Sequence, residues 1–327
     1  MTHPTSTQNL TSTTTSALPS TTTATTSSTT SLETATTASS TTRPSATLPP
    51  TATTPTASPA PTTPPTSRKI GLVGWGAIGR VVGTALAEGK VPGAELICIV
   101  DNRALGDAPV PQLSFEDALD RCDLIVEAAG QGVVREWGER VLRSGTDLLI
   151  ASTGALTDED LASALLAAGP GRVYFTGGAV GGLDLLQAVR SLGHLTDVTL
   201  TTTKLPGTLE QPWMDEDLLH RMRTATGPVE VMRGTARDVP VKFPKSTNVA
   251  ASVALAVGDL DAVRVHVVAD PAARHTRHVI EASGSHGVYR FEVQHLPDPG
   301  NPATSQVVPY AVLRSLGALA GRRGQIL

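Results

Sequence analysis

The chain has 327 residues and a formal net charge of −4, with 26 Lys and Arg side chains against 30 Asp and Glu. The basic residues are scattered, which argues against a nucleic-acid surface, and no apolar run approaches the roughly 20 residues that span a bilayer. The two cysteines lie within or beside predicted buried strands, which favours a reduced cytoplasmic protein over a disulfide framework. We find no Cys/His cluster with metal-ligand spacing and expect no metal site.

Residues 1–67 consist almost entirely of Thr, Ser, Pro and Ala. Such a stretch has little apolar surface to bury, so it cannot offset the entropy cost of ordering. It also lacks the basic start and the continuous apolar stretch of a secretory signal. We predict a disordered tail, or upstream sequence included by a wrong start site, ahead of a folded part long enough for two modest domains.

A glycine-rich turn opens the folded part. The sequence GWGAIG begins at Gly74, with an apolar strand before it and a helical pattern after it. In that context G-x-G-x-x-G indicates a dinucleotide site: Gly74 permits the tight turn, Gly76 lets a pyrophosphate approach the backbone, and Gly79 lets helix and strand pack closely. The unpaired N–H groups of the helix then face the phosphates. We predict cofactor contacts from Gly74, Gly76, Ala77, Ile78 and Gly79.

The next strand, predicted over 95–103, carries an acidic residue near its end. Asp101 lies 22 residues after Gly79, where a carboxylate binds the adenosine ribose hydroxyls of NAD. Arg103, two residues further, would instead suit the 2′-phosphate of NADP. The sequence therefore leaves NAD and NADP open and leans towards NAD.

Strands predicted over 123–130, 147–153 and 172–178 alternate with helices. This alternation predicts a Rossmann-type doubly wound parallel sheet, with a dinucleotide-binding domain over 68–178. Ligands bind beyond the carboxyl ends of such strands. Ala128 and Ala129 stand at one of those ends and leave room for a cofactor, although a plain helix-packing turn explains them as well.

After this point the pattern changes to that of an α+β domain with a mostly antiparallel sheet, predicted over 179–302. A last helix, over 303–321, is expected to pack back on the first domain. The junction, residues 177–182, reads GGAVGG. Such a bare backbone suits close approach of a ligand, or else a tight strand-to-helix turn.

One histidine stands out in this second part. In HTRHVIEA, alternate side chains share a face of the strand, so His278 lies on the more apolar face with Thr276, Ile280 and Ala282. We expect His278 to point inward. An inward histidine is either a hydrogen-bonded core residue or a functional one.

Seven stretches, in order, carry a resemblance to the L-aspartate dehydrogenase family between residues 69 and 320. They are IGLVGWGAIGR, DLIVEAAG, TGGAVGGLDLL, TTTKLPGTL, FPKSTNVAASVALA, ADPAARHTRHVIEASGSHGVYRFEV and LPDPGNPATSQVVPYAVLRSL. The resemblance implies oxidation of L-aspartate with NAD or NADP to iminoaspartate, which hydrolyses to oxaloacetate and ammonia and can feed NAD biosynthesis. It also implies a homodimer.

The resemblance assigns roles to particular residues. The family's catalytic histidine follows an Ala-Asp-Pro turn, which makes His278 the catalytic candidate, and two cofactor-contacting positions of the family correspond to Ala179 and Asn248. Asn248 is also a good helix N-cap type. The two carboxylates of aspartate call for cationic partners, for which Lys204 and Lys245 are the candidates by motif, although each suits a solvated surface equally well.

Two other functions fit the same pattern. Another two-domain NAD(P) oxidoreductase, resembling homoserine dehydrogenase or dihydrodipicolinate reductase, would share the layout, because a fold does not determine a substrate. A non-catalytic NAD-binding sensor would keep the nucleotide site but turn over no amino acid. His278 beside an intact glycine-rich segment argues against the sensor.

Overall fold

The computed structural model describes residues 67–244, 248–298 and 300–321. The tail predicted over 1–67 therefore lies outside the described residues except for Ser67. Lys245, one of the two predicted substrate lysines, lies outside them as well.

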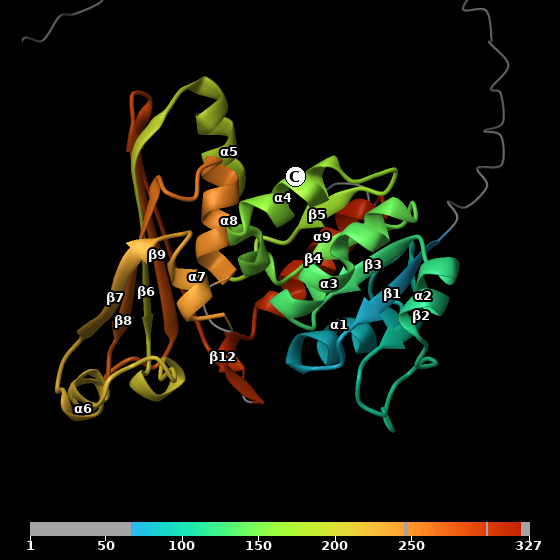
Figure 1. The fold of residues 1–327 in the computed structure, drawn as a ribbon, viewed down its shortest axis with the longest axis horizontal. Helices are drawn as coiled ribbons and strands as arrows, with labels where there is room; N and C mark the ends of the chain where they lie inside the picture. Colours follow the sequence, from blue (N-terminus) through green and yellow to red (C-terminus); the bar gives the residue numbers. More distant parts are fainter. Residues whose placement is uncertain (1–66, 245–247, 299, 322–327) are drawn as a thin grey trace, which may run out of the picture. The chain divides into compact units, whose positions relative to one another are not determined.

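The first half forms a parallel five-stranded sheet in the order β2-β1-β3-β4-β5 (Figure 1). Its strands are β1 (Arg68–Val73), β2 (Ala94–Val100), β3 (Leu124–Glu127), β4 (Asp147–Ile150) and β5 (Val173–Phe175). The strand order reverses between β1 and β3, and in doubly wound sheets ligands bind at that point. The predicted Rossmann-type sheet is confirmed.

Helices cover both faces of this sheet. On one face, α1 (Ala77–Ala87) and α9 (Val308–Leu319) share an apolar cluster with Ile70, Leu72 and Leu149. On the other face lie α2 (Phe115–Arg121), α3 (Gln131–Arg143) and α4 (Glu159–Ala167), packed on side chains such as Ile125 and Ile150. The last helix thus contributes to the core of the first sheet, although it follows the second sheet in the chain.

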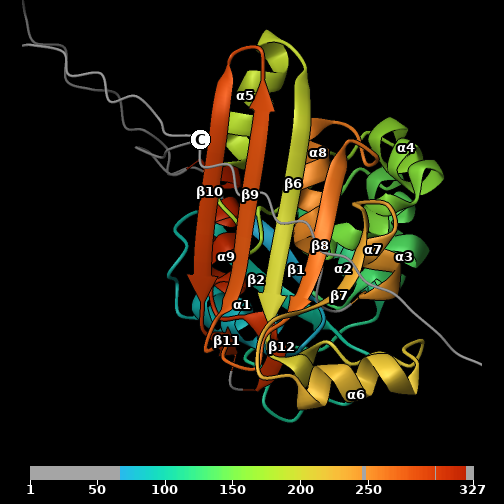
Figure 2. The same ribbon diagram turned by 90° about the vertical axis from the view of Figure 1, so that its left-hand side faces the viewer.

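The second half forms a mixed sheet in the order β10-β9-β6-β8-β7. Its strands are β6 (Leu195–Lys204), β7 (Val229–Thr235), β8 (Val263–Ala269), β9 (Thr276–Gly284) and β10 (Gly287–His295). Only the pair β6–β8 is parallel, so the predicted mostly antiparallel sheet is confirmed. Helices α5 (Leu183–Leu192) and α8 (Asn248–Val257) cover one side of this sheet. Figure 2 shows the sheet from its opposite side, with both helices behind it.

That other side of the second sheet is polar. Arg277 and Arg290 bind Glu292, and His266 binds Glu230. The side towards α5 and α8 buries the apolar residues of the second core instead. The remaining short elements of this half are η2 (Pro206–Thr208), α6 (Glu216–Thr224), α7 (Val239–Lys242), β11 (Pro297–Asp298) and β12 (Asn301–Ser305).

Several boundaries differ from the predicted ones. The strands predicted to end at residues 103, 130, 153 and 178 end at Val100, Glu127, Ile150 and Phe175. The residues that follow each end are mostly small or polar and belong to the loops at the carboxyl edge of the sheet. The helix predicted over 303–321 begins only at Val308, because residues 301–305 pair with β11 in a hairpin. Helix α6 and strand β7 lie within 207–236, where no element is predicted above.

Within the described part of the chain, every helix is too short or too polar to cross a membrane.

The glycines of the first turn give a test of the packing. A Cβ on Gly79 would lie 1.9 Å from the carbonyl oxygen of Gly74, whereas a Cβ on Gly76 would meet no atom within 4 Å. We expect Gly79→Ala to lower the free energy of unfolding by about 1–3 kcal/mol or more, because the clash outweighs the higher helix propensity of Ala, about 1 kcal/mol. Gly76→Ala is the matched control and should cost less than about 1 kcal/mol. Urea unfolding of both variants measures the difference, and equal losses would contradict the packing role.

Candidate active site

The glycine-rich turn between β1 and α1 leaves its backbone open. Gly74 has a φ of 98° and lies against the backbone of Ala128, where a Cβ would come within 2.7 Å of the carbonyl oxygen. Among the described residues, no side chain caps the N-terminus of α1, and its first turn carries no acidic residue. The first N–H groups of a helix lack intrahelical partners and attract anions. Together with the open space at Gly76, this arrangement fits the pyrophosphate of a dinucleotide.

The loops after β3 and β4 are tied together by a buried carboxylate. Glu127 is 1% exposed and accepts hydrogen bonds from the backbone N–H groups of Ala129, Gly130 and Ser152 and from the Ser152 hydroxyl, at 2.7–2.9 Å. Burial raises the pKa of Glu127, while these four donors act against that shift. Ala129 thus contributes its backbone to the edge of the site beside Gly74.

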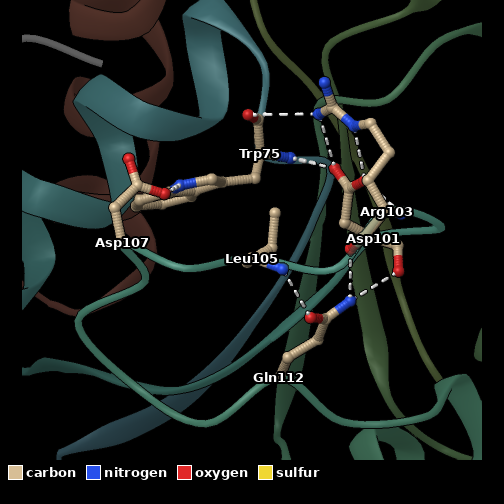
Figure 3. Close-up of polar contacts among 6 residues, drawn as sticks. All are labelled: Trp75, Asp101, Arg103, Leu105, Asp107 and Gln112. Carbon is tan, nitrogen blue, oxygen red and sulfur yellow. Dashed lines mark hydrogen bonds and ion pairs between the residues drawn. The ribbon is translucent and has the colours of Figure 1, made fainter.

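Asp101 lies at the carboxyl end of β2, away from the cavity described next. Its carboxylate accepts the backbone N–H of Trp75 at 2.7 Å and pairs with the Arg103 guanidinium (Figure 3). The bond to Arg103 is the main reason why the pKa of Asp101 is well below its usual range. Asp101 therefore links the glycine turn to the loop after β2.

Five of the predicted site residues meet around one cavity. Residues from both halves line it: Ile78, Ala151, Ser152, Thr153, Gly178, Ala179, Lys204, Asn248, Val249, Ser252, His278, Thr304, Ser305 and Val308. The predicted contacts Ile78, Ala179, Lys204, Asn248 and His278 are among them, although they come from five separate segments. Ala77, Ala128 and Ala129 are not among the residues that line this cavity. They lie at the glycine-rich turn between β1 and α1 and in the loop beside it.

His278 is held in the cavity by a single strand-to-strand contact. Its side chain is 2% exposed, and its Nδ1 lies 3.0 Å from Oγ1 of Thr202, the residue opposite it on β6. The inward orientation predicted for His278 is confirmed. Burial, with the positive charges of Lys204 and His295 adding to it, lowers the pKa of His278 to about 3. The imidazole is therefore neutral near pH 7, and Nε2 is the ring nitrogen that Thr202 does not engage.

Lys204 is the last residue of β6, and its side chain lies on the same side of the sheet as that of His278. The side chain is 3% exposed, and burial lowers its pKa to about 8. A solvated surface position, the alternative for this lysine, is therefore wrong. A buried ammonium group favours the approach of an anion, since an opposite charge offsets part of its desolvation cost.

The glycine-rich segment 177–182 serves two purposes. A Cβ on Gly182 would lie 2.5 Å from the ring of Phe291, so this glycine makes room for a core side chain. Gly178 and Gly181, by contrast, have open space where a Cβ would be, and Gly178 has a φ of 62°. Internal packing therefore accounts for Gly182, whereas Gly178 and Gly181 leave the backbone of the segment uncovered.

A second, larger cavity lies along the same segment. Its volume is about 460 Å³, and it shares Gly178 and Ser252 with the cavity around His278. Only the smaller cavity combines buried titratable side chains, His278 and Lys204, with the predicted cofactor contacts.

Asn248 joins the two halves of the molecule. It is the first described residue of α8, and its Oδ1 accepts the backbone N–H of Gly154 at 3.1 Å. Its carbonyl oxygen accepts the hydroxyl of Thr153, which also contacts the Ser252 hydroxyl at 2.9 Å. Both Thr153 and Gly154 belong to η1 (Thr153–Thr157), the turn after β4.

Three further residues organise the site without a signal in the sequence. Thr202 orients His278, Glu127 joins two loops, and His295 on β10 engages the Ala179 carbonyl oxygen through Nε2 at 3.0 Å. A threonine in a β-strand and a carboxylate at a strand end are ordinary features of a sequence. The contacts Glu127–Ser152, Thr202–His278 and His295–Ala179 join residues 25, 76 and 116 positions apart in the chain, so only the folded structure reveals these roles.

Comparisons with known proteins agree with this arrangement. A family model described as "Homoserine dehydrogenase, NAD binding domain" matches residues 74–171, and one described as "Aspartate dehydrogenase, C-terminal" matches residues 184–319. The homoserine dehydrogenase match covers only the nucleotide-binding half. The half that carries His278 and Lys204 matches aspartate dehydrogenase.

Individual relatives extend this likeness over both halves. The L-aspartate dehydrogenase 2 of Bordetella bronchiseptica is 35% identical over 266 residues, which cover 76% of this chain and 96% of that protein. The L-aspartate dehydrogenase of Ruegeria pomeroyi is 38% identical over 208 residues, 62% of this chain and 74% of that protein. The crystal structure of aspartate dehydrogenase from Thermotoga maritima superposes with a TM-score of 0.62 at 26% identity, covering 80% of this chain and 98% of that one. With nearly the whole length of such relatives matched, the chain belongs to the L-aspartate dehydrogenase family.

Proposed function

We propose that this chain oxidises L-aspartate with NAD or NADP at the cavity around His278, releasing oxaloacetate and ammonia. The observation that carries the proposal is the convergence of a buried imidazole, a buried ammonium and the glycine-rich segment on one cavity. NAD or NADP, when bound, supplies the acceptor for the hydride that leaves Cα of aspartate.

The first half of the chain holds the cofactor. Gly74, Gly76 and the N-terminus of α1 bind the pyrophosphate through backbone N–H groups, and Ala77, Ile78, Gly79, Ala128 and Ala129 shape the surrounding turns. The bare backbone at Gly178 and Ala179 receives the nicotinamide end, since open space lies beside it. Asn248 contributes a carboxamide at the same cavity. A cofactor bound along this path would have its nicotinamide end in the cavity lined by His278.

Lys204 holds a carboxylate of the substrate. A buried cation at the end of β6 supplies a charge-assisted contact for an anion that leaves water. Lys245, the other predicted cation, lies outside the described residues and stays a prediction.

His278 moves the protons. Hydride leaves Cα only when the substrate nitrogen carries a lone pair, so the ammonium group of aspartate must first lose a proton. In the tautomer that carries its proton on Nδ1, beside Thr202 Oγ1, Nε2 of the neutral imidazole accepts that proton. The two carboxylates of aspartate offset the charge of Lys204, which raises the pKa of His278 as the substrate binds. His278 then assists the addition of water to the imine, from which ammonia departs.

Two alternatives are weaker. A homoserine dehydrogenase-like enzyme is supported only by the nucleotide-binding half, and a sensor without turnover leaves the buried His278–Lys204 pair unexplained. Purified protein tested with L-aspartate and L-homoserine, by absorbance of the reduced nicotinamide, separates all three. The predicted homodimer and cytoplasmic location stay predictions.

Replacement of the imidazole tests its role in proton transfer. We expect His278→Asn to lower kcat by about 100- to 10,000-fold, as loss of a general acid–base group does, while cofactor binding changes little. His275→Asn, three residues earlier and exposed, is the control and should keep wild-type activity. Steady-state kinetics with aspartate measure both variants, and a near-normal kcat for His278→Asn would remove the imidazole from the mechanism.

Thr202 provides a separate test of positioning. Thr202→Val keeps the shape of the side chain but removes the partner of His278 Nδ1, so we expect kcat to fall about tenfold with a smaller change in KM. Thr202→Ser retains the hydroxyl and should recover most of the loss. A purely structural role for Thr202 would instead lower thermal stability without splitting kcat from KM.

The buried imidazole should also make folding depend on pH. The pKa of His278 is about 3 in the folded chain and about 6.5 in an unfolded one. The unfolded state therefore takes up the proton first, and stability falls as pH drops below 6.5. Between pH 7.5 and 5.5 this single group should cost about 1.4 kcal/mol. Urea unfolding of the wild type and His278→Asn at both pH values should show that loss only in the wild type, and parallel losses would contradict it.

A further inference from the structure

Asp101, the carboxylate expected to bind the adenosine ribose, already accepts four hydrogen bonds within the protein. Asp101 accepts hydrogen bonds from the backbone N–H groups of Trp75 and Arg103 at 2.7 and 3.0 Å (Figure 3). It also accepts Nε of Arg103 on Oδ1 at 2.9 Å and Nη2 on Oδ2 at 3.0 Å. An ionised carboxylate has about four lone-pair sites. Four donors therefore use nearly all of its capacity, and little is left for the two hydroxyls of a ribose.

The charge of Asp101 is also compensated. In an NAD-selective site, a carboxylate at this position binds the ribose hydroxyls, and its charge opposes a 2′-phosphate. Here the side chain of Asp101 is only 6% exposed and forms a bidentate pair with Arg103. Its bonds hold the glycine turn at Trp75 to the loop after β2, so the carboxylate acts as an internal anchor.

Arg103 carries an exposed positive charge in the loop after β2. Its side chain is 62% exposed, and its bonds to Asp101 and to the Trp75 carbonyl oxygen use Nε and Nη2, which leaves Nη1 outside the pair. The backbone beneath it is held by Gln112, whose Nε2 donates to the carbonyl oxygens of Asp101 and Arg103 at 2.8 Å. The guanidinium thus projects from a fixed loop beside the glycine turn.

The other arginine nearby has a carboxylate of its own. Arg80 lies over the Trp75 ring and pairs with Asp107, which also accepts Nε1 of Trp75 at 3.0 Å. Arg80 therefore helps to fix Trp75 and the loop around Asp107. Arg103 remains the cation placed to meet a ligand at the end of β2.

We propose that Arg103 determines cofactor selectivity by binding the 2′-phosphate of NADP, so that the chain takes NADP in preference to NAD. The guanidinium fork matches a phosphate as well as it matches a carboxylate. When the cofactor binds, the Arg103 guanidinium exchanges part of its hydrogen bonding to Asp101 for hydrogen bonds to the phosphate. The backbone N–H groups of Trp75 and Arg103 keep Asp101 in place. The inference rests on the dinucleotide site of the proposed function, but not on aspartate as substrate.

Adenosine fragments of the two cofactors test the inference without turnover. Calorimetry with 2′,5′-ADP and 5′-AMP reports the contribution of the 2′-phosphate alone. We expect the wild type to bind 2′,5′-ADP at least tenfold more tightly than 5′-AMP. Arg103→Leu should weaken 2′,5′-ADP about 10- to 100-fold, the range of a charged hydrogen bond, and leave 5′-AMP within about threefold. The kcat/KM ratio of NADP to NAD should fall in parallel.

The controls separate this effect from charge and from folding. Arg143→Leu removes the same charge from an exposed arginine at the far end of α3 and should leave the fragment ratio unchanged. Arg103→Lys keeps the charge without the fork and should retain part of the preference, which covers the case in which Arg103→Leu fails to fold. Equal binding of the two fragments by the wild type, or an unchanged ratio in Arg103→Leu, would overturn the inference. Fragment selectivity in a protein that leaves aspartate untouched would overturn only the proposed activity.

Discussion

The site depends on two partly buried hydrogen bonds between the turn after β4 and the start of α8. Thr153 donates its hydroxyl to the Asn248 carbonyl oxygen, and the Asn248 side chain accepts the N–H of Gly154. These groups bridge the parallel sheet and the mixed sheet. Because unpaired polar groups are costly away from water, the contact strongly favours one relative placement of the two halves. That placement brings Ala179 and the His278 imidazole of β9 to the same cavity.

The charge of the cavity is determined by two buried side chains, Lys204 and His278. A buried lysine and a buried histidine line one small cavity, and the positive charge of Lys204 disfavours protonation of His278. Burial keeps His278 neutral near pH 7, and the positive charge of Lys204 adds to that effect. Thr202 adds orientation, since a neutral imidazole is useful only when its free nitrogen faces the substrate.

The two carboxylates of the nucleotide half show how the same chemical group serves different ends. Glu127 is enclosed by backbone donors and joins two loops, whereas Asp101 joins the glycine turn to β2 and carries Arg103 on its outer side. Neither role follows from the presence of a carboxylate near a strand end. Each follows from which donors surround the carboxylate: backbone N–H groups and a serine hydroxyl around Glu127, and an exposed arginine beside Asp101.

The sequence by itself determined the alternation of strands and helices, the glycine turn and the inward face of β9, because these depend on periodicity and on local backbone freedom. It also placed His278, Ala179 and Asn248 by resemblance, and the fold brought them to one cavity. Only the tertiary structure decided that Gly182 makes room for Phe291, that Lys204 is buried, and that Thr202, Glu127 and His295 support the site. It also ended four strands of the parallel sheet about three residues earlier than predicted and started α9 at Val308. These features depend on partners distant in the chain, and short-range pattern carries no information about which distant groups will meet.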